Sequence, residues 1–340
     1  MTYNGGRPSA SALIASRRKP LRISTERLVA IEPLAGSDTC FALMRPRLPS
    51  LSVAEWTIAN RESLERELQI RGALLLRGFD NTDAAGFEAF VRASSGPLLE
   101  YDNRSTPRSR VAGRVFTSTE YPADQVIPQH NEMSYADVWP RRIYFNCVIP
   151  AETGGQTPLA NGARVLARIP ADVRGRFERH GVLYVRNYGQ RFDLPWQEAF
   201  QTDNAAVVEE YCREHRIEFE WLPEQRLRTR QVSQATAVHS ETGQAVWFNQ
   251  AHLFHVSALH DEIRIELERQ FAPEDLPRNA YYGDGSSIDV ETLAIIRAAY
   301  AAEELVFTWE VGDILIVDNL LMSHGRRSYS GPRRILVAMT

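Results

Sequence analysis

Apolar and polar residues alternate along the chain with two periods, which predict both helices and short strands. Residues 53–71 carry Trp56, Leu64 and Leu68 at near-helical spacing. Residues 72–79 form a short apolar run between glycines, which is typical of a buried strand. The same criteria predict further helices around Phe87 and Phe90, at 203–215 and at 288–302, and further strands at 143–149, 226–232, 314–317 and 335–339. The alternating arginines of 226–232 favour an edge or half-exposed strand.

Many short strands with a few helices favour a mainly β domain with helical additions (α+β). The chain shows no internal repeat and no linker, so residues 21–340 are predicted to form one domain. With 340 residues, of which 44% are apolar, that domain has enough apolar mass for a substantial core. Residues 1–20 are rich in Gly, Ser, Ala, Arg and Pro, and we expect this tail to be disordered.

Charge and cysteine content narrow the functional classes. A net charge of −4 argues against nucleic acid or an anionic membrane as a partner, and no apolar run approaches the ~20 residues that span a bilayer. Only Lys19 is a lysine, so lysine nucleophiles and phosphate-binding loops are not expected in the domain. Cys40, Cys147 and Cys212 form no ligand or disulfide pattern. We therefore expect a cytoplasmic protein that binds anions through arginine, histidine or backbone groups.

Two distant segments contain the residue types of a non-haem iron site. His130 and Glu132 form an H-x-E motif in a segment that reads as extended, where alternate side chains share one face. His324 follows a turn, an apolar strand and a polar break. Two imidazoles and one carboxylate are suited to Fe(II). Either segment alone is common in ordinary polar loops, and their order along the chain strengthens the hypothesis.

Two further segments offer groups for a carboxylate. An arginine shortly after a metal-binding histidine can grip the far carboxylate of a co-substrate chelated by the iron. Arg333 and Arg334 are the candidates, and strand alternation lets only one of them face the metal. The Gly154-Gly155 pair suits a tight turn, and Thr157 after it offers a hydroxyl, although a plain β-turn explains that segment as well.

Taken together, these segments resemble the Fe(II)/2-oxoglutarate-dependent oxygenases of the taurine dioxygenase and clavaminate synthase type. The resemblance implies a double-stranded β-helix, a cupin-like jelly roll, with iron on His130, Glu132 and His324. It also implies 2-oxoglutarate on Thr157 and on an arginine, and O2 as the oxidant. A Gly-x-Arg pattern in related enzymes favours Arg333, whereas alignment with the taurine motif favours Arg334; we favour Arg333.

Within this family the chain is most similar to the syringomycin-type amino-acid β-hydroxylases. The similarity lies in residues 129–161, 247–255 and 324–339. It implies hydroxylation of an amino acid, free or bound to a peptidyl carrier protein, in nonribosomal peptide, siderophore or other secondary-metabolite biosynthesis. Gln129, Asn131 and Asn249 are candidate substrate contacts.

Two departures from related enzymes restrict the chemistry. Ala338 stands where the taurine enzyme has its sulfonate-binding arginine, if the alignment runs through Arg334, so a sulfonate substrate is disfavoured. Related halogenases have Ala or Gly where this chain has Glu132, so hydroxylation is favoured over chlorination.

Three alternatives remain open from the sequence. The same iron chemistry serves desaturation or cyclisation, and a jelly roll can persist as a binding protein without turnover. His252 and His255 are three residues apart and could bind zinc on one helical face, although a lid or core segment explains them better and a substrate contact is a further alternative.

Overall fold

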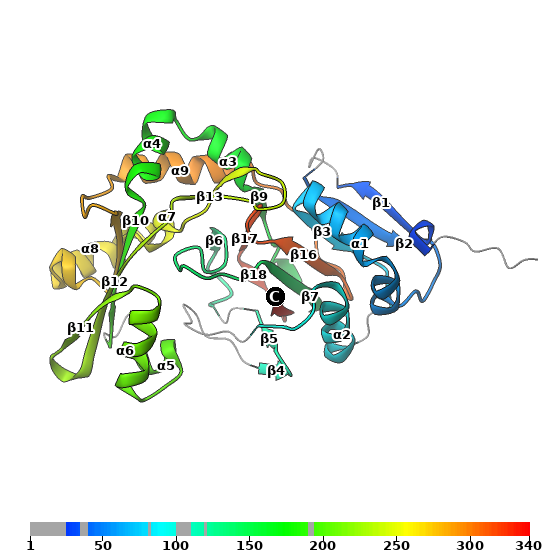
Figure 1. Ribbon diagram of the computed structural model, residues 1–340, viewed down its shortest axis with the longest axis horizontal. Helices are drawn as coiled ribbons and strands as arrows, with labels where there is room; N and C mark the ends of the chain where they lie inside the picture. The colour runs from blue at the N-terminus through cyan, green and yellow to red at the C-terminus, as the bar shows by residue number, and fades with distance from the viewer. Residues whose placement is uncertain (1–24, 35–39, 81–82, 100–109, 119–120, 190–193) are drawn as a thin grey trace, which may run out of the picture.

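The computed structural model describes residues 25–34, 40–80, 83–99, 110–118, 121–189 and 194–340. The predicted disordered tail at 1–20 lies outside the described residues. Strands dominate, and helices cover their outer faces (Figure 1). Within the described part of the chain, no helix is both long and apolar enough to cross a membrane.

The largest sheet has eight strands and contains most of the predicted ones. Its order is β1 (Val29–Pro33), β2 (Ala42–Pro46), β3 (Ala73–Leu76), β16 (Ile314–Asp318), β7 (Arg142–Ile149), β19 (Arg334–Met339), β5 (Val115–Thr117) and β4 (Arg110–Ala112). Neighbouring strands are antiparallel except β2 and β3, which are parallel. The strands predicted at 72–79, 143–149, 314–317 and 335–339 are therefore confirmed at the centre of one sheet.

Alternation along each strand divides this sheet into two apolar faces. On β16, Ile314 and Ile316 pack toward α1 (Val53–Arg71) and α2 (Ala84–Ser95). Leu315 and Val317 pack on the opposite face. The predicted helix at 53–71 is confirmed: Ser52 caps its start by accepting the Glu55 backbone N–H, and a left-handed Gly72 ends it.

A smaller sheet lies against the second face and completes the sandwich. It comprises β6 (Ile127–His130), β17 (Met322–Arg326) and β9 (Leu159–Asn161), with β17 in the centre. β18 (Tyr329–Ser330) pairs beside it with β8 (Thr153–Gly154). Leu159 and Met322 of the small sheet pack with Phe145 and Val337 of the large one. Two facing antiparallel sheets with helical cover form the predicted jelly roll, and the sheets stay open rather than closing into a barrel.

A third sheet with its helices occupies the left half of Figure 1. Its order is β11 (Glu218–Leu222), β12 (Arg226–Ser233), β10 (Val182–Tyr188) and β15 (Arg278–Tyr282). The surrounding elements are α3 (Gly162–Arg168), α4 (Ala171–His180), α5 (Trp196–Phe200), α6 (Ala205–Glu214), the β13 (Thr236–Val238) and β14 (Ala245–Trp247) hairpin, α7 (Ala251–Phe254), α8 (Asp261–Gln270) and α9 (Val290–Ala302).

Residues 226–232 are predicted to form an edge or half-exposed strand. The edge position is wrong, because β12 lies between β11 and β10, but the strand is half-exposed as predicted. Its polar side chains are compatible with an inner position because they have partners. The buried Arg228 donates to the Asn187 side chain at 2.8 Å and also pairs with Glu220 and Asp275.

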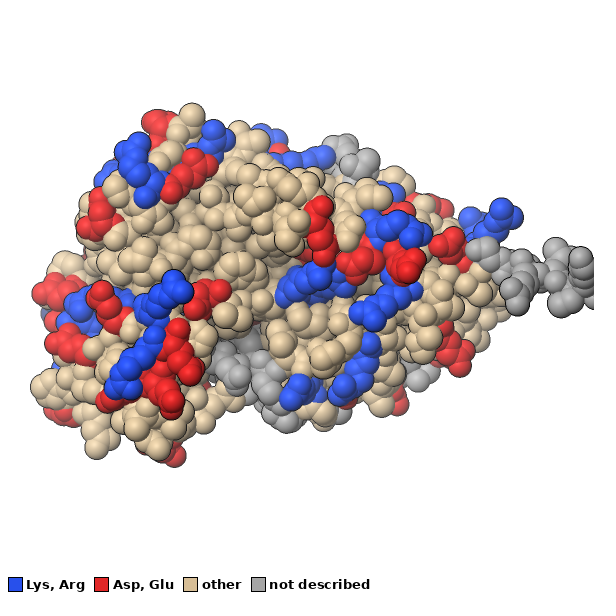
Figure 2. Space-filling model, in the orientation of Figure 1, with Lys and Arg blue, Asp and Glu red and all other residues tan. Residues whose placement is uncertain are grey.

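Surface arginines lie mostly beside acids. Figure 2 shows basic and acidic side chains next to one another at the left end and the upper right of the visible face. Arg213 pairs with Glu209 at 2.7 Å, and Arg264 pairs with Glu268 at 3.2 Å. Ion pairing of this kind accounts for many of the arginines without any ligand, so an arginine that is buried without an acid is the exception that needs an explanation.

Candidate active site

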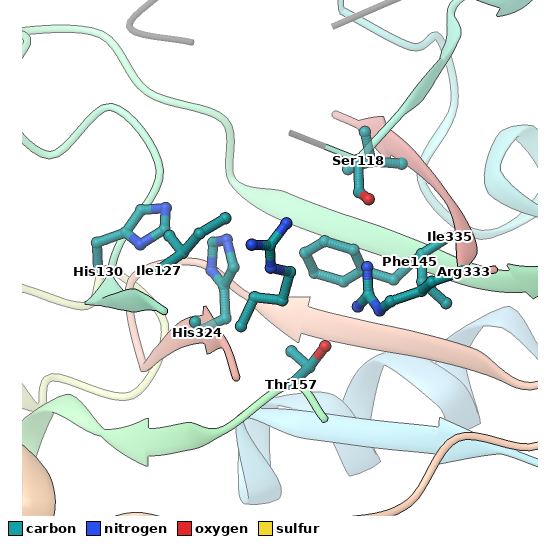
Figure 3. Close-up of a pocket in the computed structure, with 11 residues that line it drawn as sticks. Ser118, Ile127, His130, Phe145, Thr157, His324, Arg333 and Ile335 are labelled. Carbon is teal, nitrogen blue, oxygen red and sulfur yellow. The ribbon is translucent and has the colours of Figure 1, made fainter. Parts of the chain in front are cut away.

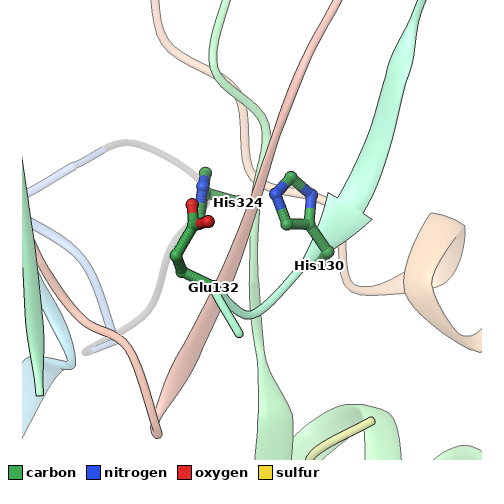
Figure 4. Close-up of side chains that lie close together, drawn as sticks. All are labelled: His130, Glu132 and His324. Atoms are coloured by element: carbon green, nitrogen blue, oxygen red, sulfur yellow. The ribbon is translucent and has the colours of Figure 1, made fainter. Parts of the chain in front are cut away.

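Pairing between β6 and β17 brings the three predicted metal ligands together. His130 on β6 stands directly opposite His324 on β17, and their ring centroids are 4.6 Å apart. Glu132 completes the group, with all three candidate ligand atoms within 4.8 Å of one another (Figure 4). In the described part of the chain, no other group of three His, Cys, Asp or Glu residues is close enough to hold a metal ion.

The H-x-E segment differs from the extended conformation that we expected. β6 ends at His130, and Glu132 lies in the turn that follows. Glu132 is therefore aimed by the turn and not by strand alternation. That geometry requires a separate support for the turn, since the strand hydrogen bonds stop at His130.

The histidine on β6 is held with one ring nitrogen directed at the metal position. Nδ1 of His130 lies 2.9 Å from the carbonyl oxygen of Pro128. Because a carbonyl can only accept, Nδ1 carries the proton and Nε2 keeps its lone pair for a metal ion.

Asn319 supplies the support for Glu132. Its Oδ1 accepts the backbone N–H of Glu132 at 2.7 Å, and its Nδ2 donates to the Glu132 carbonyl at 2.9 Å. The same amide donates to the Pro140 carbonyl, and the Asn131 side chain donates to the Asn319 carbonyl at 2.6 Å. Asn319 thus acts on Glu132 as a neighbouring strand would. Sequence reasoning gave this residue no role, although it stands in the same polar break that precedes His324.

Beside His324 a pocket opens between the two sheets (Figure 3). Its lining comprises Ser118, Ile127, His130, Phe145, Thr157, His324, Gly325, Arg326, Arg333, Ile335 and Val337. Arg333 therefore lies in the pocket, whereas Arg334 is exposed and outside it. Ile335 and Val337 of β19 share the face that lines the pocket, and Arg333, directly before the strand, lies on the same side.

One hydrogen bond orients the Arg333 side chain in the pocket, and another orients the Thr157 hydroxyl. Arg333 Nε donates to the carbonyl of Gly155 at 3.1 Å, and Gly155 has φ +69°. A Cβ at Gly155 would lie 3.1 Å from the Arg333 side chain, so glycine allows the close approach. Trp309 Nε1 donates to Thr157 Oγ1 at 3.1 Å, which leaves the threonine proton to donate to an anion. Sequence reasoning missed Trp309, because no motif marks it.

The pocket carries positive charge that no acid among the described residues balances. Burial, together with the nearby Arg326 guanidinium, lowers the pKa of Arg333 to about 10. Within the described residues, no carboxylate pairs with Arg333. Burial also lowers the pKa of Arg326, which donates to three backbone carbonyls of the 121–125 loop. Since a buried cation without a counter-ion is costly, the pocket is suited to an anion.

The three candidate substrate contacts hold the scaffold and do not line this pocket. Gln129 accepts the Ser323 hydroxyl at 2.9 Å. Asn249 donates to the Ala235 carbonyl at 2.8 Å and accepts the Ala251 N–H at 3.0 Å. Asn131 is engaged with the β16–β17 loop, as described above. A substrate contact by these residues stays a prediction.

His252 and His255 use their ring nitrogens elsewhere. His252 Nε2 lies 2.9 Å from the Gln129 carbonyl, and His255 Nδ1 accepts the Ser257 N–H at 3.1 Å. No third ligand joins them in the part of the chain that the structure describes. The zinc alternative therefore has no support in the geometry.

Comparison with known proteins decides the family. The family model described as "Taurine catabolism dioxygenase TauD, TfdA family" matches residues 31–340. The chain belongs to this family. It is 39% identical over 309 residues to the dapdiamide synthesis protein DdaC of Enterobacter agglomerans, which covers 91% of this chain and 93% of that protein. It is 30% identical over 307 residues to a clavaminate synthase-like protein of Arabidopsis thaliana, covering 86% of this chain and 89% of the relative. The protein is accordingly an enzyme of the dioxygenase class.

Solved structures agree on the fold. PvcB from Pseudomonas aeruginosa matches with a TM-score of 0.55 and 16% identity, over 92% of this chain and 90% of its own. AAD-2, solved with Mn(II) and N-oxalylglycine, matches with a TM-score of 0.52 and 11% identity, over 92% and 96% of the two chains. At these identities the likeness concerns the fold, and it confirms the predicted jelly-roll class.

Proposed function

We propose that this chain is a non-haem Fe(II)/2-oxoglutarate-dependent oxygenase that hydroxylates an unactivated C–H bond of an amino acid. The observation that carries the proposal is the convergence of His130, Glu132 and His324 next to a pocket with a largely buried arginine that no described acid pairs with. Two imidazoles and one carboxylate fit Fe(II) and leave positions open for ligands. The Arg333 guanidinium and the Thr157 hydroxyl fit the far carboxylate of 2-oxoglutarate.

The residues of the chain then have separate tasks. When bound, iron supplies the reactivity with O2 that converts 2-oxoglutarate to succinate and CO2 and oxidises the substrate. Arg333 balances and orients the co-substrate carboxylate, and Thr157 donates a second hydrogen bond to it. Phe145, Ile335 and Val337 line the pocket with apolar surface and exclude water from it.

Three observations support the substrate class and the reaction. The relative DdaC is named for dapdiamide synthesis, which favours a biosynthetic role for this chain in secondary metabolism. Glu132 fills the ligand position that halogenases leave open, which favours hydroxylation. Val337 is apolar and lies four residues after Arg333 in the pocket, and Ala338 packs on the helix side of the sheet, so neither offers a cation for a sulfonate. The substrate is an amino acid, free or bound to a peptidyl carrier protein.

The cellular setting follows from the thiols. Cys147 and Cys212 are free and buried. Thiols that remain unpaired are typical of reducing compartments, which favours a cytoplasmic enzyme.

The test combines co-substrate turnover with product mass. Anaerobic protein given Fe(II) and 2-oxoglutarate should develop a weak visible charge-transfer band, and with O2 and the right amino acid it should release succinate. Mass spectrometry on a panel of amino acids, each free and carrier-loaded, should find a product with one added oxygen atom. Loss of two hydrogens without added oxygen would instead assign desaturation or ring closure. Succinate release that persists in a His130→Ala/His324→Ala double variant would refute the metal assignment.

A further inference from the structure

The strand that carries His130 has hydrogen-bond partners on both edges, but only one edge pairs with a strand. In the three-stranded sheet, β6 is at the edge and pairs with β17. The backbone carbonyls of the residues before and after His130 accept from side chains of the 250–252 segment. Gln250 Nε2 donates to the Asn131 carbonyl at 2.7 Å, and His252 Nε2 donates to the Gln129 carbonyl at 2.9 Å.

Both donors are fixed in place by their own surroundings. Gln250 is 6% exposed and His252 is 3% exposed. The Gln250 backbone N–H donates to the Tyr184 hydroxyl of β10 at 2.7 Å. The His252 ring stacks on Tyr300 with centroids 4.7 Å apart, and Arg297 donates to the His252 carbonyl at 2.9 Å. Neither side chain is free to turn away from β6.

The Gln129 carbonyl determines which ring nitrogen of His252 carries the proton. A carbonyl oxygen can only accept, so Nε2 carries the proton. Burial lowers the pKa of His252 to about 4, so the ring is neutral near pH 7 and acts as a hydrogen-bond donor from Nε2 alone. Neither His252 nor Gln250 lines the pocket beside His324.

We propose that Gln250 and His252 are positioning residues that hold the 130–132 segment, and with it His130 and Glu132, in the geometry needed for metal binding. The His252 bond fixes the peptide group between Gln129 and His130, which helps to set the direction of the His130 Cα–Cβ bond. The Gln250 bond fixes the peptide group between Asn131 and Glu132, which does the same for Glu132. The inference rests on the proposed function, because it concerns the same metal site. It also gives a role to the 247–255 stretch, which had suggested zinc or substrate contact.

The arrangement has a consequence for the whole molecule. α7 begins directly after Gln250 and packs against β15 and α9, which belong to the four-stranded lobe. The side chains of Gln250 and His252 therefore connect the four-stranded sheet and its helices to the metal-ligand segment of the jelly roll. Loss of a hydrogen-bond partner that supports a metal ligand lowers metal affinity about 10- to 100-fold. We expect a value near the lower end here, because each donor acts on the backbone and not on the imidazole itself.

Three substitutions on one segment test the proposal. His252→Phe keeps an aromatic ring against Tyr300 and removes the donor. His252→Gln restores an N–H at a similar reach. His255→Phe is the matched control, because His255 lies on the same segment and its ring bonds only to Ser257 in the described structure.

Metal affinity is measured on the full chain by titrating apoprotein with Mn(II) and following the EPR signal of the free ion. Urea unfolding of each apoprotein is measured alongside. We expect His252→Phe to weaken Mn(II) binding about tenfold, His252→Gln to recover most of that loss, and His255→Phe to match the wild type. The Fe(II)/2-oxoglutarate charge-transfer band should shift or weaken in His252→Phe only.

The outcomes separate the inference from the proposed function. Unchanged Mn(II) affinity in a folded His252→Phe variant would overturn the positioning role. The positioning role would also be overturned if Mn(II) affinity fell only in parallel with the free energy of unfolding and His252→Gln did not restore it. Failure of the wild-type protein to bind Mn(II) or Fe(II) would instead overturn the proposed function.

Discussion

Replacement of Arg333 by methionine should change stability and co-substrate affinity in opposite directions. In the apoprotein the Arg333 guanidinium is buried without a described acid, and its pKa falls from 12.5 to about 10. The pKa of this group lies above neutral pH in both the folded and the unfolded chain. At pH 7.5 the arginine is therefore charged in both states, and the folded state bears the full cost of burying the charge.

The magnitudes follow from this burial. At about 1.4 kcal/mol per pKa unit, the fall corresponds to roughly 3 kcal/mol against the folded apoprotein. Methionine keeps most of the apolar stem but loses the hydrogen bond to the Gly155 carbonyl, which is worth about 1 kcal/mol. We expect apo Arg333→Met to be more stable by about 1–2 kcal/mol. Loss of a desolvated ion pair with the co-substrate costs about 3–5 kcal/mol, so the KM for 2-oxoglutarate should rise by about two to three and a half orders of magnitude.

Two measurements on the same preparation check this prediction. Urea unfolding without 2-oxoglutarate gives the stability change, and succinate formation at varied 2-oxoglutarate gives KM. Arg334→Met is the control, because Arg334 is exposed and outside the pocket, and it should be close to neutral in both assays. The reasoning is refuted if Arg333→Met loses several kcal/mol of stability or keeps its affinity for 2-oxoglutarate.

Three further results are expected. Trp309→Phe frees the Thr157 hydroxyl from its 3.1 Å donor, and steady-state kinetics should show a few-fold rise in KM for 2-oxoglutarate with the fold intact. Burial raises the pKa of Cys147 to about 12 and that of Cys212 to about 11, so a thiol reagent at pH 8 should modify them only after denaturation. Burial holds the pKa of His252 near 4, below its unfolded value of 6.5, so the unfolded chain binds more protons at mildly acidic pH. The free energy of unfolding of the apoprotein, measured with urea, should therefore fall by about 1 kcal/mol between pH 7 and pH 5.5 because of this group. It should fall less in His252→Phe.

Local sequence determined most of the elements. The helix predicted at 53–71 has the observed bounds, and the helices predicted at 203–215 and 288–302 form as Ala205–Glu214 and Val290–Ala302. The spacing of apolar residues and the capping residues are local signals, so the sequence alone is sufficient to predict these helices. The position of β12 inside its sheet is not local, because it depends on acids that pair with Arg228 from other segments.

The residue types of the metal site were also evident from the sequence, because His130, Glu132 and His324 occur in a recognisable order. The sequence could not decide between Arg333 and Arg334, since alternation permits either until a neighbouring strand fixes which face points inward. The pairing of β19 within the large sheet fixes that face and puts Arg333 in the pocket.

Only the tertiary structure decided how the site is held. The donors to β6 come from Gln250 and His252, which lie 119 and 123 residues along the chain from their acceptors. Asn319 lies 187 residues from Glu132. A sequence shows which side chains can donate or accept, but the partner of each is set by which segments the folded core packs together. In this protein the sequence therefore determined the chemistry of the ligands, and the packing of distant segments determined their geometry.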